Sequence, residues 1–119
     1  MNELIACLGN DSGKPHVEKL IGSFSWDNII IIQSEENIVL NAKKGSAVVN
    51  IIKADTKKPS EQLTEDLRNE LKKLTKSSQT GINFFSGSGK LHMATIAAAL
   101  KLGLGIRLIV ISPEGIKEL

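Results

Sequence analysis

The run Ile29–Ile32 sets the strongest limit on how this chain folds, because all four of its residues are β-branched. Branching at Cβ restricts the side-chain rotamers and favours extended backbone, so the run predicts a β-strand. Successive side chains of a strand point to opposite faces, and this strand is therefore apolar on both faces. Strands of this kind are typical of parallel sheets that helices cover on both sides, so the run predicts an α/β sandwich.

Further apolar runs alternate with helical patterns along the chain, as in α/β proteins with a mostly parallel sheet. They predict about five strands, at residues 4–8, 29–32, 47–52, 82–85 and 107–111. Residues 112–115 are predicted to form a turn near the end of the chain. Residues 34–46 fit two patterns, and a helix over 35–44 is favoured over a strand at 38–40 because Gly45 is a suitable helix end.

Three helices follow from apolar residues at helical spacing. The first begins at Pro15 and has an apolar face of Val17, Leu20, Ile21 and Phe24. The second covers residues 60–76, with an apolar stripe of Leu63, Leu67, Leu71 and Leu74. The third covers residues 91–102 and is rich in alanine, at Ala94, Ala97, Ala98 and Ala99. Small side chains allow close approach, either to the core or to a second subunit.

Length and composition are those of a globular domain, with 119 residues, 41% of them hydrophobic, and we expect a single domain over residues 1–119. The net charge of +2 is too small for a protein that coats nucleic acid. No apolar run approaches the ~20 residues of a membrane span, and Met1-Asn2-Glu3 is not the basic start of a signal peptide. The single cysteine, Cys7, lies in an apolar run and is expected in the core, so a cytoplasmic location is expected.

Two polar loops follow predicted strands, at Gly9–Gly13 and Ser86–Lys90. In an open α/β sheet, ligands bind beyond the carboxyl ends of the strands, where such loops lie. Glycines let backbone amides approach a ligand, a helix N-terminus favours an anion, and Lys90 adds a positive charge. The composition of the second loop leaves two interpretations open: an anion site, or a Gly/Ser turn with a surface lysine.

The second loop departs from the phosphate-binding loop of nucleotide hydrolases. That motif needs a glycine five residues before the Gly-Lys pair and a Ser or Thr after it, but Phe84 and Leu91 stand at these positions. The first loop lacks the Gly-x-Gly-x-x-Gly pattern of dinucleotide-binding proteins. Neither nucleoside triphosphate hydrolysis nor a bound dinucleotide cofactor is expected, and no cysteine-based metal cluster is available.

The segment from Asn83 to Ala94, with the sequence NFFSGSGKLHMA, resembles the signature of CRISPR-associated Rossmann-fold (CARF) domains. In that family a strand ends in a Ser/Thr-Gly-Gly-x-Lys/Arg loop, and an Ala-rich helix with a methionine follows. Gly9, Ser12 and the Pro15–Val17 segment are similar to the family's first loop, and residues 109–115 are similar to its last strand. The chain departs from the pattern at Ser88, which replaces a glycine, and at Met93, which comes one position late.

The resemblance implies a Rossmann-like three-layer sandwich that binds a cyclic oligoadenylate, a second messenger of antiviral defence, at the interface of a homodimer. It implies no cofactor, metal or membrane. Because no nuclease or DNA-binding domain follows residue 119, it implies a stand-alone sensor or a fragment of a larger effector. The ligand-binding residues that it implies lie in the two loops: Gly9, Asn10, Asp11, Ser12, Ser86, Gly87, Ser88, Gly89 and Lys90.

Two alternatives remain beside the sensor. Some CARF domains cleave the cyclic ligand without a metal, and in such a ring nuclease Lys90 and Ser86 would be the catalytic residues. His92 is a candidate base, although a packing role is favoured because it lies within the helix, and a surface position is expected for His16. The other alternative is a regulatory or interaction domain without a small-molecule ligand. Direct DNA binding is not expected, because the helix at 60–76 mixes acidic and basic residues.

Overall fold

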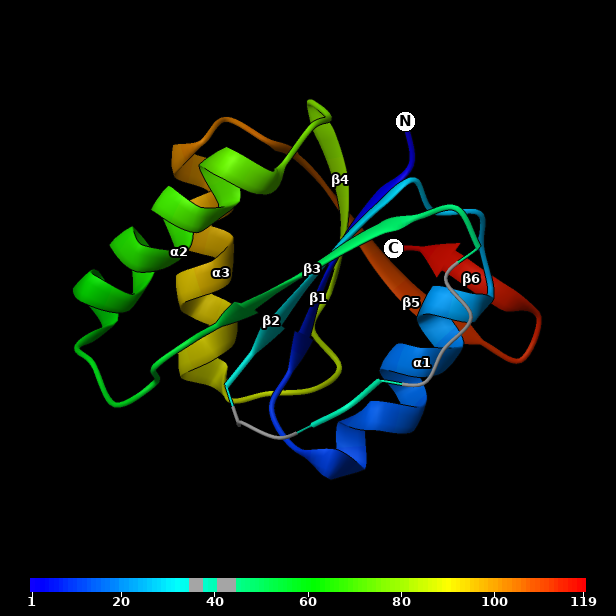
Figure 1. Ribbon diagram of the computed structural model, residues 1–119, viewed down its shortest axis with the longest axis horizontal. Helices are drawn as coiled ribbons and strands as arrows, with labels where there is room; N and C mark the ends of the chain where they lie inside the picture. Colours follow the sequence, from blue (N-terminus) through cyan, green and yellow to red (C-terminus); the bar gives the residue numbers. More distant parts are fainter. Residues whose placement is uncertain (35–37, 41–44) are drawn as a thin grey trace.

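The protein is a Rossmann-like α/β sandwich built on a six-stranded sheet with the order β3-β2-β1-β4-β5-β6 (Figure 1). The computed structural model describes residues 1–34, 38–40 and 45–119. The strands are β1 (Glu3–Leu8), β2 (Asn28–Gln33), β3 (Val48–Lys53), β4 (Gln79–Asn83), β5 (Gly105–Ser112) and β6 (Gly115–Glu118). The helices are α1 (Lys14–Gly22), α2 (Ser60–Leu74) and α3 (Gly89–Lys101), and a short 3₁₀ turn, η1 (Asp11–Gly13), precedes α1.

Strands β1 to β5 run parallel, which confirms the predicted mostly parallel sheet. Strand β1 lies between β2 and β4, so the direction in which successive strands are added reverses between β1 and β4. Strand β6 was not predicted: the turn expected at residues 112–115 is the tip of a hairpin, and β6 pairs antiparallel with β5.

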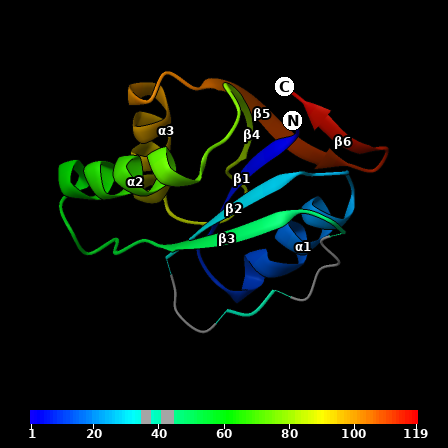
Figure 2. The same cartoon turned by 45° about the horizontal axis from the view of Figure 1, so that its top comes forward.

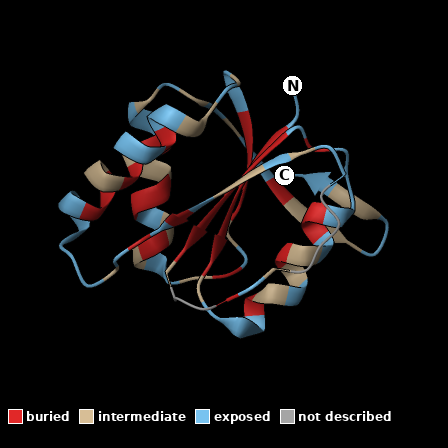
Figure 3. Ribbon diagram, in the orientation of Figure 1, coloured by how far each residue is buried: buried red, intermediate tan, exposed pale blue. Residues whose placement is uncertain are grey.

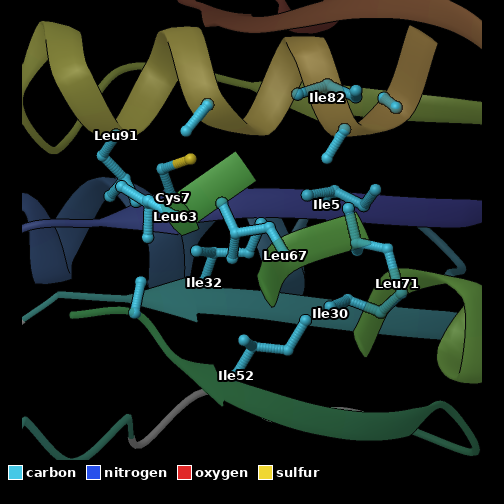
Figure 4. Packing of buried hydrophobic residues seen from close by; sticks show 14 residues of the cluster. Ile5, Cys7, Ile30, Ile32, Ile52, Leu63, Leu67, Leu71, Ile82 and Leu91 are labelled. Carbon is cyan, nitrogen blue, oxygen red and sulfur yellow. The ribbon is translucent and has the colours of Figure 1, made fainter. Parts of the chain in front are cut away.

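Helices cover both faces of the sheet, with α1 on one face and α2 and α3 on the other (Figures 1 and 2). The isoleucine run of β2 is completely buried and contributes to both cores. Ile30 and Ile32 pack in the cluster that holds the leucines of α2 and the alanines of α3 (Figure 4). Ile29 and Ile31 pack in the cluster that holds α1 and Trp26. The central strands are accordingly the most buried part of the molecule (Figure 3).

Several predicted boundaries differ from the structure. Phe24 lies beyond the end of α1 and is 48% exposed, so it is not part of the apolar helix face. Strand β4 ends at Asn83, and Phe84 and Phe85, which were predicted to lie within it, follow it as a loop. Residues 38–40 form neither helix nor strand, and the rest of the helix predicted over 35–44 lies outside the described residues.

A buried carboxylate joins three parts of the sheet at the amino ends of its strands. Glu3 is 2% exposed and accepts hydrogen bonds from Nδ2 of Asn28 at 2.8 Å, the backbone N–H of Lys76 at 2.7 Å and the hydroxyl of Thr80 at 2.7 Å. Three donors compensate for the loss of solvation of a buried charge. None of the described helices is both long enough and apolar enough to cross a membrane.

Candidate functional site

The two candidate loops meet where the strand order reverses. Strands β1 and β4 are parallel neighbours, so the loops that follow them leave the sheet at the same edge, shown at the lower side of Figure 1. Ligands of open α/β sheets bind at such a topological switch point. The predicted proximity of residues 9–13 and 86–90 is therefore present in the fold.

The loops contact each other directly, through Ser86. Its side chain is 5% exposed, and its hydroxyl oxygen accepts the backbone N–H of Gly9 at 2.9 Å. A Cβ on Gly13 would collide with the side chain of Ser86, and a Cβ on Gly9 would lie 2.8 Å from the backbone nitrogen of Gly87. The glycines at 9 and 13 are thus required by the packing of one loop on the other.

The first loop presents polar side chains on the surface. Asn10, Asp11 and Ser12 are exposed. The side-chain oxygen of Asn10 accepts hydrogen bonds from the hydroxyl of Ser12 at 2.6 Å and from the backbone N–H of Gly13 at 3.2 Å. Asn10 therefore caps the η1 turn, an arrangement typical of asparagine at this position.

The second loop leads into the N-terminus of α3. The hydroxyl of Ser88 caps the helix by accepting the backbone N–H of Leu91 at 3.2 Å. Gly87 has a φ of +105°, which favours glycine at this position. The first helical residues, Gly89 and Lys90, are partly or fully exposed. Their backbone amides point out of the helix end, where the partial positive charge of the helix dipole is greatest.

His92 supports this loop from within α3. Its Nε2 lies 2.7 Å from the carbonyl oxygen of Ser86, and its ring lies 5.1 Å from the ring of Phe84. A carbonyl oxygen only accepts, so Nε2 of His92 carries the proton and donates it. These contacts favour the packing interpretation of His92 over the general-base interpretation.

The structure adds three residues that the sequence interpretation did not combine: His16, Asn83 and Phe85. Nδ2 of Asn83 donates to the carbonyl oxygen of Ile109 at 2.8 Å, and its Oδ1 accepts the backbone N–H of Phe85 at 3.2 Å. These two bonds fix the orientation of the amide, so Nδ2 also donates to Nε2 of His16 at 3.3 Å. His16 is then neutral, with its proton on Nδ1.

The surroundings of His16 agree with a neutral imidazole. Burial, together with the charge of Lys19, lowers the pKa of His16 from its ordinary value. The imidazole also lies flat against the ring of Phe85, with the centroids 3.8 Å apart and the planes 10° apart. The only sequence signal for this group was an aromatic residue directly before the glycine loop.

A cavity of about 450 Å³ opens beside these residues. It lies between the carboxyl-terminal parts of β4 and β5, because the pairing of these strands ends at Ile82 and Leu108. Its lining is mostly apolar and includes His16, Asn83, Phe85, Leu108, Val110 and Leu119. A small organic ligand fits a cavity of this size.

Comparisons with known proteins add no family: no family model matches the chain, and no curated protein sequence matches it either. Among residues 1–34, 38–40 and 45–119, no group of three or more His, Cys, Asp or Glu side chains is placed to hold a metal ion.

Proposed function

We propose that this protein is a CARF-like sensor domain that binds a cyclic oligoadenylate as a homodimer. The observation that carries the proposal is the meeting of two glycine-containing loops, after β1 and β4, at the topological switch point of the sheet. The resemblance of residues 83–94 to the CARF signature supplies the ligand class.

The second loop has the chemistry that a phosphate needs. The N-terminus of the 13-residue helix α3 offers backbone amides and a partial positive charge. Lys90 lies in the first turn of this helix, and none of the ion pairs between described residues uses its ammonium group. Phosphate oxygens would accept hydrogen bonds from both kinds of donor.

The outer surface of α3 supports the homodimer. Met93 and Leu100 are seven residues apart, on the same side of the helix, and are 68% and 63% exposed. Ile96 and Ala97 lie partly exposed between them. This apolar stripe begins beside Lys90, so a second copy packed against it would bring the loops of both subunits to one ring-shaped ligand. Replacing Leu100 with glutamate should then shift the protein from dimer to monomer in analytical ultracentrifugation.

Thermal unfolding in the presence of cyclic tetra-adenylate and cyclic hexa-adenylate tests the ligand. A ligand that binds only the folded state raises the melting temperature. Lys90→Ala should weaken binding by at least about tenfold, because a hydrogen bond to a charged group contributes ~1.5–3 kcal/mol. Lys101→Ala, at the other end of α3, is the matched control and should bind as the wild type does. Equal affinity of the two variants, or no stabilisation of the wild type by either ring, would contradict the proposal.

We propose binding without cleavage, because Ser86, a candidate catalytic residue, is buried and its hydroxyl oxygen already accepts a hydrogen bond from the backbone N–H of Gly9. Incubation of the protein with labelled rings in EDTA separates the two activities. Intact rings are expected after prolonged incubation, whereas linear products would identify a metal-independent ring nuclease.

A further inference from the structure

Phe85 is an exposed aromatic residue whose position is fixed. It is 63% exposed, more than any other described phenylalanine or the tryptophan. Its backbone N–H is bonded to Asn83, and one face of its ring is covered by His16. An exposed phenyl group loses the free energy that burial would supply. A ring that is both exposed and oriented is suited to stack against a flat partner.

The adjoining cavity has the character of a site for a flat, largely apolar group. Leu108, Val110 and Leu119 provide apolar surface, and His16 and Asn83 provide the polar atoms. Asn83 uses its amide on His16, Ile109 and the backbone of Phe85. The amide of Asn83 is therefore not available to a ligand, and the apolar lining and the free face of Phe85 remain for binding.

The position of Phe85 relates the cavity to the phosphate chemistry of the neighbouring loop. Phe85 directly precedes Ser86, the first residue of the loop that leads to the amides of Gly89 and Lys90. If a nucleotide binds with its phosphate at the N-terminus of α3, Phe85 is the aromatic side chain at the other end of the same loop and is available to the base. Stacking on aromatic side chains is the common way in which proteins hold single nucleobases.

We propose that Phe85 is the stacking platform for a purine base of the nucleotide ligand, and that the base lies in the cavity between β4 and β5. A purine has a larger stacking surface than a pyrimidine. This inference rests on the proposed function, because the phosphate of the same ligand is placed at the N-terminus of α3.

Binding of cyclic tetra-adenylate to the full chain measures the contribution of Phe85. Phe85→Ala should weaken binding by about 5- to 100-fold, and Phe85→Trp should keep the affinity and show quenching of the new indole on binding. Phe24→Ala is the control, because Phe24 is an exposed phenylalanine outside both candidate loops. Wild-type affinity of Phe85→Ala together with lost binding in Lys90→Ala would overturn the stacking role and leave the proposed function intact.

Nuclear magnetic resonance of the ¹⁵N-labelled full chain tests the platform without a cyclic ligand. Adenosine should shift the amide of Phe85 and the side-chain amide of Asn83 more than uridine does, whereas inorganic phosphate should shift the amides of Gly89 and Lys90. Absence of an adenosine effect at Phe85, even at millimolar concentration, would overturn the inference. An adenosine effect at Phe85 in a protein that binds no ring would support the base site and contradict the cyclic ligand.

Discussion

Ser86 and the glycines around it control how closely the two candidate loops approach. The hydroxyl oxygen of Ser86 accepts a hydrogen bond from the backbone N–H of Gly9. Because Gly9 and Gly13 have no Cβ, the second loop can lie directly against them. A ligand that touches both loops therefore meets a single surface whose two halves are already joined. Substitutions at these residues change the stability of the protein as well as the surface.

Replacing Gly9 with alanine should destabilise the protein. The added methyl group would press on the backbone of Gly87, and strain of this kind costs about 1–3 kcal/mol. Gly22→Ala is the control, since a Cβ at that position in α1 has no neighbour within 4 Å. Urea unfolding of both variants measures the difference. Equal stability of Gly9→Ala and the wild type would show that the loops separate easily.

The titration of His16 should make the protein less stable in acid. Burial lowers the pKa of His16 in the folded state, so below its ordinary pKa of 6.5 the unfolded chain binds more protons than the folded one. The contribution of neutral His16 is complete above this pH and is lost as the pH falls through the lower folded pKa. Unfolding curves of the wild type and His16→Gln between pH 5 and 8 should therefore show wild-type stability declining relative to the variant in acid. A relative gain in acid would contradict the neutral, Asn83-bonded histidine.

At the scale of elements, the helices differ in how they cover the sheet. Helix α2 inserts large side chains, Leu63, Leu67 and Leu71, each at most 1% exposed. Helix α3 presents Ala94, Ala98 and Ala99 to the same core. Small residues on one helix leave space for large residues on the other, which is how two neighbouring helices fill one layer.

The loss of stability on truncating a leucine of α2 should increase with the burial of that leucine. Leu67→Ala removes a fully buried side chain and should cost about 2–5 kcal/mol. Leu74→Ala, seven residues later on the same helix face, removes a partly exposed side chain and should cost clearly less. Denaturant unfolding gives both values, and equal costs would mean that the two leucines are equally buried in solution.

Hydrophobic periodicity predicted most elements, and its errors have physical causes. The start of β4 was missed because Gln79 and Thr80 are polar, although Thr80 is buried and donates its hydroxyl to Glu3. Its end was misplaced because Phe84 and Phe85 are apolar, although Phe85 is exposed. Strand β6 was missed because it is only four residues long and is specified by pairing with β5 rather than by its own pattern.

The candidate loops were predictable because parallel neighbouring strands end at one edge, and this rule needs only the element order. Two contacts were not predictable from the chain alone. The burial of Ser86 depends on how closely Gly9 and Gly13 approach it. The stacking of His16 on Phe85 depends on the placement of the first turn of α1 over the end of β4.

At the scale of the whole molecule, two hydrophobic cores share one sheet. The only tryptophan, Trp26, belongs to the core on the α1 side, and the only cysteine, Cys7, belongs to the core under α2 and α3. Cys7 is fully buried, as predicted, and burial raises the pKa of its thiol to about 12. Each core therefore contains one unique chemical probe.

The two cores should unfold together, because the side chains of β1 and β2 alternate between them. Trp26 fluorescence and labelling of Cys7 by a thiol reagent should give the same midpoint in urea, and Cys7 should remain unlabelled without denaturant. An earlier midpoint for either probe would show that one helical layer leaves the sheet independently.

The position of β1 between β2 and β4 has a consequence for synthesis on the ribosome. The chain emerges from its amino end, so β1 is made before both of its neighbouring strands. The carboxylate of Glu3 can accept both of its hydrogen bonds from Lys76 and Thr80 only after the start of β4 has appeared. Until α2 and α3 have also emerged, strands β1 to β3 have an apolar face that these helices do not yet cover. Before that point, the nascent chain exposes a hydrophobic surface to which a chaperone can bind.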